Sequence, residues 1–113
     1  MKNMLENTYT LENGIKIPKL GLGTWFIDDS EVAEAVREAV KIGYRMIDTA
    51  QAYGNERGVG EGVRTCGIPR EDLFVVSKVA AEHKTYEQAM AGMDETLKKM
   101  GLYYQDFCRV FAF

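Results

Sequence analysis

Segments with the pattern of β-strands alternate with helical segments along this chain, and this alternation constrains the fold more than any other feature. The four predicted strand starts lie roughly 25 to 35 residues apart, with a helix predicted between each pair. These strands cover residues 20–25, 45–49, 73–79 and 107–113. The third is an unbroken apolar run, which suits a sheet covered on both faces. This rhythm indicates βαβ units and a parallel sheet.

A β-hairpin is predicted before the first of these units. Residues 8–11 and 15–17 flank Asn13-Gly14, a pair that favours the positive φ angles of a type I′ turn. Pro18 then prevents the second hairpin strand from continuing as a central strand, because proline cannot donate a ladder hydrogen bond.

Capping signals bound the predicted helices. Residues 28–30 offer side-chain oxygens as N-caps for a first helix, which ends at Gly43. A second helix covers residues 56–66, although its three glycines weaken that prediction. Thr85 and Gln88 form a capping box at the start of a third helix. The residues expected to face inward are Val32, Val36, Ala39, Val40, Val59, Val63, Ala89, Met93, Leu97 and Met100.

Composition excludes several classes of protein. The 113 residues suit one small domain, and a net charge of -3 without a basic cluster argues against nucleic acid as a partner. No apolar run approaches the roughly 18 residues of a membrane span, and the N-terminus has no leader pattern. Cys66 and Cys108 match no metal-binding spacing, so no metal site is predicted. We expect reduced thiols in a cytoplasmic protein.

Two architectures share this rhythm, the doubly wound sheet and the (β/α)₈ barrel. A dinucleotide-binding doubly wound domain carries G-x-G-x-x-G between its first strand and helix. Gly21 and Gly23 are present here, but the third position is Phe26, and the glycines of residues 58–62 do not follow a strand. The motif therefore argues against that fold.

Polar side chains at the carboxyl ends of two strands indicate a site. Asp48 and Lys78 each follow an apolar run, and Tyr53 lies a few residues beyond Asp48. All strand C-termini of a parallel barrel face one mouth, where these groups would converge. An aspartate holds a neighbouring lysine in place, and a lysine lowers the pKa of a nearby phenol, which can then act as a general acid. The alternative is that such residues serve as loop anchors or ion pairs.

Motifs around these residues resemble the aldo-keto reductase family. Residues 43–50 (GYRMIDTA), 53–56 (YGNE) and 59–60 (VG) are similar to the first signature of that family. Residues 17–25 resemble the hairpin plug and first strand, and residues 74–79 resemble the strand that carries the family's lysine. The resemblance extends over essentially residues 8–106.

This resemblance implies a (β/α)₈ barrel that reduces aldehydes and ketones to alcohols, with NADPH as the hydride donor and NADH as the alternative. Tyr53 would be the general acid, tuned by Lys78, and Asp48 would hold Lys78 and lie near the cofactor. Gly23, Thr24 and Trp25 would also contact the cofactor, and Trp25 and Tyr53 would line the substrate pocket. The implied substrate is a small carbonyl compound.

The resemblance breaks at the C-terminal end. Phe111 stands where the family has a catalytic histidine, and His83, in the loop after the third strand, does not replace it. A complete barrel takes about 250 residues. We therefore expect one partial, truncated barrel domain over residues 1–113, with a hairpin plug at 1–18 and β/α units at 19–113. A frameshift or early stop is the hypothesis for the unusual tail.

Two further interpretations remain open. Negligible turnover is expected of the chain alone, so it could instead act as a non-catalytic half-barrel that associates through its exposed sheet edges. The partner would be a second copy or the missing C-terminal half of the barrel. A fragment of another barrel enzyme, such as an isomerase, is disfavoured by the pattern of Asp48, Tyr53 and Lys78.

Overall fold

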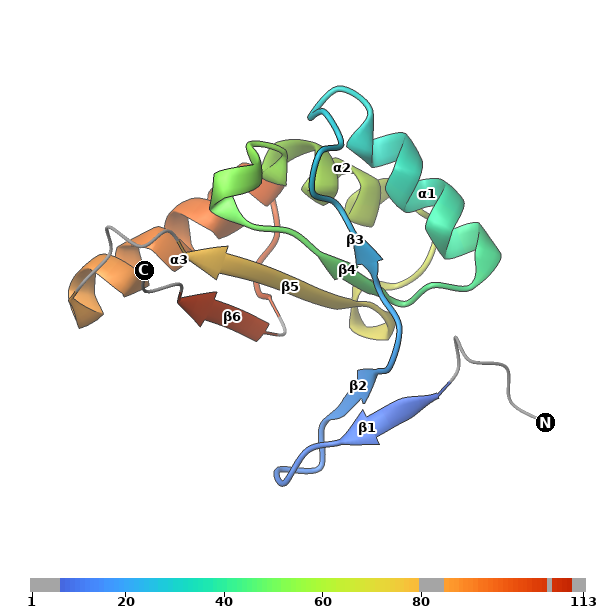
Figure 1. Cartoon of the computed structure of the whole chain (residues 1–113), viewed down its shortest axis with the longest axis horizontal. Coiled ribbons are helices and arrows are strands. Elements are labelled where there is room, and N and C mark those ends of the chain that lie inside the picture. The colour runs from blue at the N-terminus through green and yellow to red at the C-terminus, as the bar shows by residue number, and fades with distance from the viewer. Residues whose placement is uncertain (1–6, 80–84, 106, 111–113) are drawn as a thin grey trace.

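A hairpin and a parallel sheet with helices packed on one of its faces make up the described part of the chain (Figure 1). The computed structural model describes residues 7–79 and 85–105, together with the backbone of residues 107–110. The hairpin pairs β1 (Thr8–Thr10) with β2 (Lys16–Pro18) in antiparallel fashion. The sheet contains, in chain order, β3 (Leu22–Gly23), β4 (Met46–Asp48), β5 (Phe74–Val79) and β6 (Phe107–Val110). The helices are α1 (Val32–Ile42), α2 (Glu56–Thr65) and α3 (Tyr86–Met100), with 3₁₀ turns η2 (Gln51–Tyr53) and η3 (Arg70–Asp72).

The arrangement confirms the predicted fold class. All neighbouring strands of the four-stranded sheet are parallel, with a helix between each consecutive pair. In Figure 1 the hairpin projects away from this sheet at the end where β3 begins. β3 is shorter than predicted, because the chain leaves the strand at Thr24 and turns. His83 and Phe111 lie outside the described residues, as do the side chains of Cys108 and Arg109.

The predicted type I′ turn of the hairpin is wrong. Gly14 has a φ of +84°, but Asn13 is not among the residues with positive φ. The N–H of Gly14 donates to the carbonyl of Leu11 at 2.9 Å, and the N–H of Leu11 donates to the carbonyl of Ile15 at 2.8 Å. This is the longer hairpin loop in which an ordinary turn precedes one left-handed glycine. The backbone of Asn13 is not left-handed, and its side-chain oxygen accepts a hydrogen bond from the N–H of Ile15.

The core lies between the helices and the sheet. α1 packs against α2, and α2 packs against α3, along one side of the strands (Figure 1). The core residues are Val32, Val36, Val40, Ile47, Val59, Val63, Leu73, Val75 and Met100. The predicted inward faces of α1 and α2 are confirmed. On α3 the predicted stripe is only half-buried apart from Met100, and the buried positions are Gly92, Thr96 and Met100.

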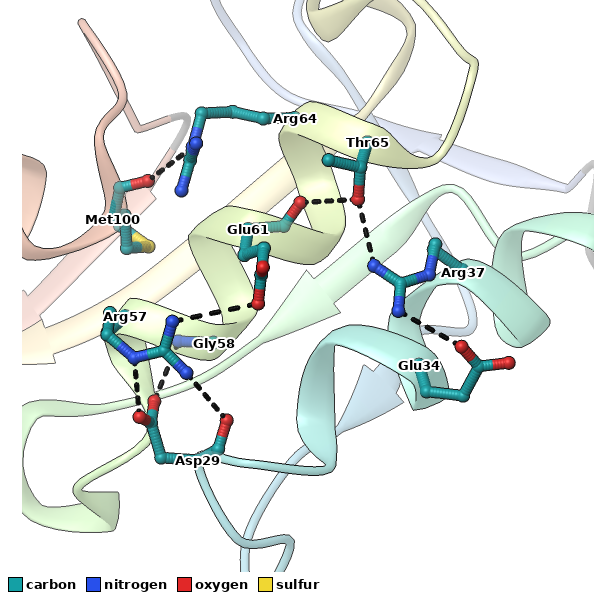
Figure 2. A network of polar contacts seen from close by, with 9 residues as sticks. All are labelled: Asp29, Glu34, Arg37, Arg57, Gly58, Glu61, Arg64, Thr65 and Met100. Atoms are coloured by element: carbon teal, nitrogen blue, oxygen red, sulfur yellow. Dashed lines mark hydrogen bonds and ion pairs between the residues drawn. The ribbon is translucent and has the colours of Figure 1, made fainter.

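The glycines of α2 have a packing role that offsets their poor helix propensity. A Cβ on Gly60 would lie 1.9 Å from the carbonyl oxygen of Met100, and one on Gly62 would lie 2.6 Å from the Cβ of Val36. These positions therefore let α2 approach α3 and α1 closely. Arg64 adds a hydrogen bond to the Met100 carbonyl at 3.1 Å (Figure 2).

Asp29, predicted as an N-cap of the first helix, caps α2 instead. The N-cap of α1 is Glu31, which makes no side-chain capping hydrogen bond. One carboxylate oxygen of Asp29 accepts from the N–H of Gly58 at 2.7 Å, and the other pairs with Arg57 at 2.6 Å (Figure 2). The prediction assigned the carboxylate to the nearest helix in sequence, whereas in the folded chain it accepts from an N–H in the first turn of α2, a group that has no partner within its own helix.

Candidate active site

Strand alternation places Asp48 and Lys78 on one face of the sheet. Ile47 and Val75 are buried in the core beneath the helices. Their successors in the chain, Asp48 and Val76, pair across β4 and β5, and side chains alternate along a strand. Lys78 follows Val76 by two residues, so it lies on the same face as Asp48. This face is the one turned away from the helices.

Lys78 is the centre of the polar cluster. Its ammonium pairs with the carboxylate of Asp48 and donates to the carbonyl of Thr49 at 3.1 Å. The same nitrogen lies 3.5 Å from the hydroxyl of Tyr53 and 5.2 Å from the centre of its ring. The Lys78 side chain is 11% exposed and that of Asp48 is 35% exposed. The three residues predicted to converge at the strand ends are therefore brought together.

A tight turn presents Tyr53. The residue closes η2, which begins three residues after the end of β4, and Gly54 follows with a φ of +69°. A left-handed conformation favours glycine, and here it lets α2 begin three residues after Tyr53. The short connection from β4 therefore keeps the Tyr53 hydroxyl within reach of Lys78.

Thr24 supports the cluster from within the fold. It is fully buried, and both its N–H and its hydroxyl donate to the carbonyl of Asp48, at 3.1 and 2.9 Å. Asp48 is thus held by its backbone from one side while its carboxylate pairs with Lys78 on the other. Gly23 pairs with Asp48 across β3 and β4, and a Cβ added to it would meet nothing within 4 Å. Open space therefore lies beside the cluster.

Two exposed aromatic rings follow β3. Trp25 is 65% exposed and Phe26 is 85% exposed, and their rings stack with centres 4.3 Å apart. Trp25 lies in a turn, not in the predicted strand. The rings form an apolar surface on the loop that leaves the carboxyl end of β3.

Asn55 and Glu56 belong to the same turn as Tyr53 but were absent from the predicted site. Both side chains are buried, at 0% and 3% exposure for the whole residue. The hydroxyl of Thr49 donates to Asn55 at 2.7 Å, and that of Ser77 donates to Glu56 at 2.8 Å. The sequence signal that could have indicated them is a pair of consecutive polar residues at the predicted start of a helix, beginning two residues beyond the candidate acid Tyr53.

The described residues contain no group of three or more His, Cys, Asp or Glu side chains arranged to hold a metal ion. Among the helices that the structure describes, none combines the length and apolar character needed to cross a bilayer.

Comparison with family models connects this geometry to known proteins. The model described as "Aldo/keto reductase family" matches residues 19–110, which is most of the chain. The chain belongs to the aldo/keto reductase family. The resemblance read from the sequence motifs is confirmed, and with it an assignment to a family of oxidoreductases.

Curated relatives of this aldo/keto reductase chain are longer than the chain itself. It is 46% identical over 101 residues to 9,11-endoperoxide prostaglandin H2 reductase of Trypanosoma cruzi, a match that covers 88% of this chain and 36% of the relative. It is 42% identical over 107 residues to glyoxal reductase of Bacillus subtilis, covering 94% and 39%. The chain spans about a third to two fifths of the length of the curated relatives it matches.

Solved structures support the same assignment. An aldo/keto reductase of Brucella melitensis matches with a TM-score of 0.90 and 42% identity, over 97% of this chain and 42% of that one. A Bombyx mori aldo-keto reductase in complex with NADP matches with a TM-score of 0.83 and 34% identity, over 90% and 36%. The hairpin and four β/α strands of this chain are thus one part of the family's (β/α)₈ barrel.

Proposed function

We propose that this chain supplies the catalytic side of a reductase that converts small aldehydes and ketones to alcohols. The observation that carries the proposal is the position of the Lys78 ammonium, which contacts the Asp48 carboxylate and lies 3.5 Å from the Tyr53 hydroxyl. Tyr53 protonates the carbonyl oxygen, Lys78 stabilises the phenolate left behind, and Asp48 holds Lys78. NADPH, when bound, supplies the hydride that the carbonyl carbon receives.

The residues at the strand ends fit a nicotinamide cofactor, with NADPH preferred over NADH in this proposal. Open space beside Gly23, the partly exposed Asp48 carboxylate and the exposed Trp25 ring offer surfaces to it. In the same proposal Trp25 and Tyr53 line the pocket for the carbonyl substrate. Thr24 supports the cofactor site indirectly, because its buried hydroxyl is already bonded to the backbone of Asp48. A nearby relative of known structure was crystallised with NADP, which supports this choice.

Exchange of one tyrosine in a chimera tests the catalytic role. Residues 8–106 would replace the matching part of the Bacillus subtilis glyoxal reductase, which is 42% identical over 107 residues. We expect glyoxal-dependent oxidation of NADPH, and Tyr53→Phe should reduce it at least about 100-fold, since it removes the general acid. Tyr44→Phe is the matched control, because Tyr44 is a half-buried tyrosine without a bond to Lys78 among those described. Full turnover by the Tyr53→Phe chimera would contradict the proposal.

A titration of the 113-residue chain with NADPH tests the cofactor separately. Trp25 is the single tryptophan of the sequence, so tryptophan fluorescence reports only on the surroundings of this ring. We expect saturable quenching. Absence of quenching up to millimolar cofactor would exclude a cofactor site on the chain by itself.

The edges of the sheet support association as the second candidate function. β3 and β6 each have one neighbouring strand within the described residues, whereas every strand of a closed barrel has two. In this alternative the chain pairs with a second copy or with further strands of a barrel. Gel filtration separates the two cases, since a stable symmetric dimer supports association. A cytoplasmic location is proposed for either function, supported by the free thiol of Cys66.

A further inference from the structure

The turn that carries Trp25 is held in an unfavourable conformation. The N–H of Ile27 donates to the carbonyl of Thr24 at 3.1 Å, so Trp25 and Phe26 are its two central residues. Phe26 has a φ of +69°, and it is the one non-glycine residue with positive φ in the part of the chain that the structure describes. This position of a type II turn ordinarily requires glycine. Such strain persists only where surrounding contacts enforce it.

Asn55 supplies those contacts. Its amide nitrogen donates to the carbonyl of Thr24 at 2.8 Å and to the carbonyl of Ile27 at 3.0 Å, so it bridges both ends of the strained turn. Its amide oxygen accepts from the hydroxyl of Thr49 at 2.7 Å, which fixes the orientation of the amide. The residue is fully buried. A primary amide is the one short side chain that offers two donors and an acceptor together.

The position of Asn55 in the chain links this turn to Tyr53. Asn55 is two residues beyond Tyr53, at the N-cap of α2, yet its side chain makes no capping bond to that helix. Thr49, which orients the amide, also presents its carbonyl to Lys78. One buried side chain therefore connects the loop after β3 with the turn that presents the proposed acid.

We propose that Asn55 is a positioning residue that holds the Trp25 turn in place beside the Tyr53 turn. This inference rests on the proposed function for its purpose, since Trp25 is taken there to contact cofactor and substrate. That Asn55 holds the turn can be tested without measuring turnover. Trp25 stacks on Phe26 with ring centres 4.3 Å apart, and both residues are the central residues of this turn, so we expect a change in the turn to alter the surroundings of the Trp25 ring.

Circular dichroism of the single tryptophan in the 113-residue chain tests the inference. We expect Asn55→Ala to abolish the long-wavelength tryptophan band, while far-ultraviolet dichroism retains the helical signal. Thr49→Val should weaken the band, because it removes the donor that orients the amide but leaves both amide N–H donors. Ser77→Ala is the matched control: it removes one buried hydroxyl bond of similar length, to Glu56, and should leave the band unchanged.

The set of variants remains decisive if Asn55→Ala does not fold, because Thr49→Val then carries the test. An unchanged tryptophan band in either folded variant would overturn the inference. An equal loss in Ser77→Ala would also overturn it, by showing general loosening of the fold.

Kinetics of the chimera distinguish this inference from the proposed function. If both are correct, Asn55→Ala raises KM for glyoxal more than it lowers kcat, since Trp25 binds substrate and transfers no proton. A chimera without turnover, combined with loss of the tryptophan band in Asn55→Ala, would refute the function and support the positioning role. A larger fall in kcat than rise in KM would contradict the role assigned to Trp25.

Discussion

The carboxylate of Asp29 accepts a hydrogen bond from the backbone N–H of Gly58, at 2.7 Å across 29 residues of sequence (Figure 2). It thereby satisfies a donor in the first turn of α2 that the helix's own N-cap, Asn55, leaves unbonded. The same carboxylate pairs with Arg57 on that helix. The loop before α1 is thus joined to α2, next to the turn that presents Tyr53.

Removal of this tertiary cap should destabilise the fold. Asp29→Ala is expected to lower the free energy of unfolding by about 1 kcal/mol, the usual cost of a lost helix cap. Urea denaturation at neutral pH measures the change. Glu34→Gln is the control, because the Glu34 carboxylate pairs with Arg37 on the exposed surface and should matter little. Equal stability of Asp29→Ala and the unmodified chain would contradict the capping role.

Acid should remove the contribution of Asp29. Burial raises the pKa of its carboxyl, but hydrogen bonds from Arg57 and Gly58 and the charge of Arg57 outweigh this and lower the pKa below 3.8. A lowered pKa in the folded state means that the stabilisation is complete above pH 3.8 and is lost as the pH falls through the lower, folded-state value. The difference in stability between the unmodified chain and Asp29→Asn should therefore be constant near neutrality and shrink below pH 3.8. A stability difference that grows as the pH falls would contradict the direction assigned to the pKa shift of Asp29.

A single added methyl group should separate α2 from α3. In Gly60→Ala the new Cβ would lie 1.9 Å from the backbone carbonyl oxygen of Met100, which cannot move without shifting the helix. We expect a loss of about 3 kcal/mol or more, at the upper end of overpacking effects. Gly23→Ala is the matched control for thermal unfolding, because its Cβ meets nothing within 4 Å. Tolerance of Gly60→Ala would show that the two helices are not closely packed.

Asp48 and Lys78 should be energetically coupled. Asp48→Asn and Lys78→Met are each expected to cost about 1 to 3 kcal/mol, since each leaves a charged group without its partner. The double variant should be more stable than the sum of the single losses predicts, by about 1 kcal/mol. The exposed pair of Glu95 and Lys99, 3.2 Å apart, provides a comparison cycle with coupling below about 0.5 kcal/mol. Additive losses for Asp48 and Lys78 would argue against their ion pair.

Most of the fold and the centre of the candidate site could be predicted from local patterns. The capping box of Thr85 and Gln88 appears at the start of α3 as expected. Asp48 and Lys78 lie at the ends of neighbouring parallel strands, and the parallel arrangement alone brings such residues together. These predictions succeed because strand periodicity and helix capping depend on residues only a few positions apart.

Other features depend on groups that are distant in the chain and meet only when the helices pack. Asp29 caps α2 and not α1, and the glycine at position 60 serves contact with α3. The amide of Asn55 bonds, instead of to its own helix, to carbonyls 31 and 28 residues earlier in the chain. A local sequence pattern cannot predict these partners, because a buried polar group bonds to whichever partner the packed core leaves unpaired.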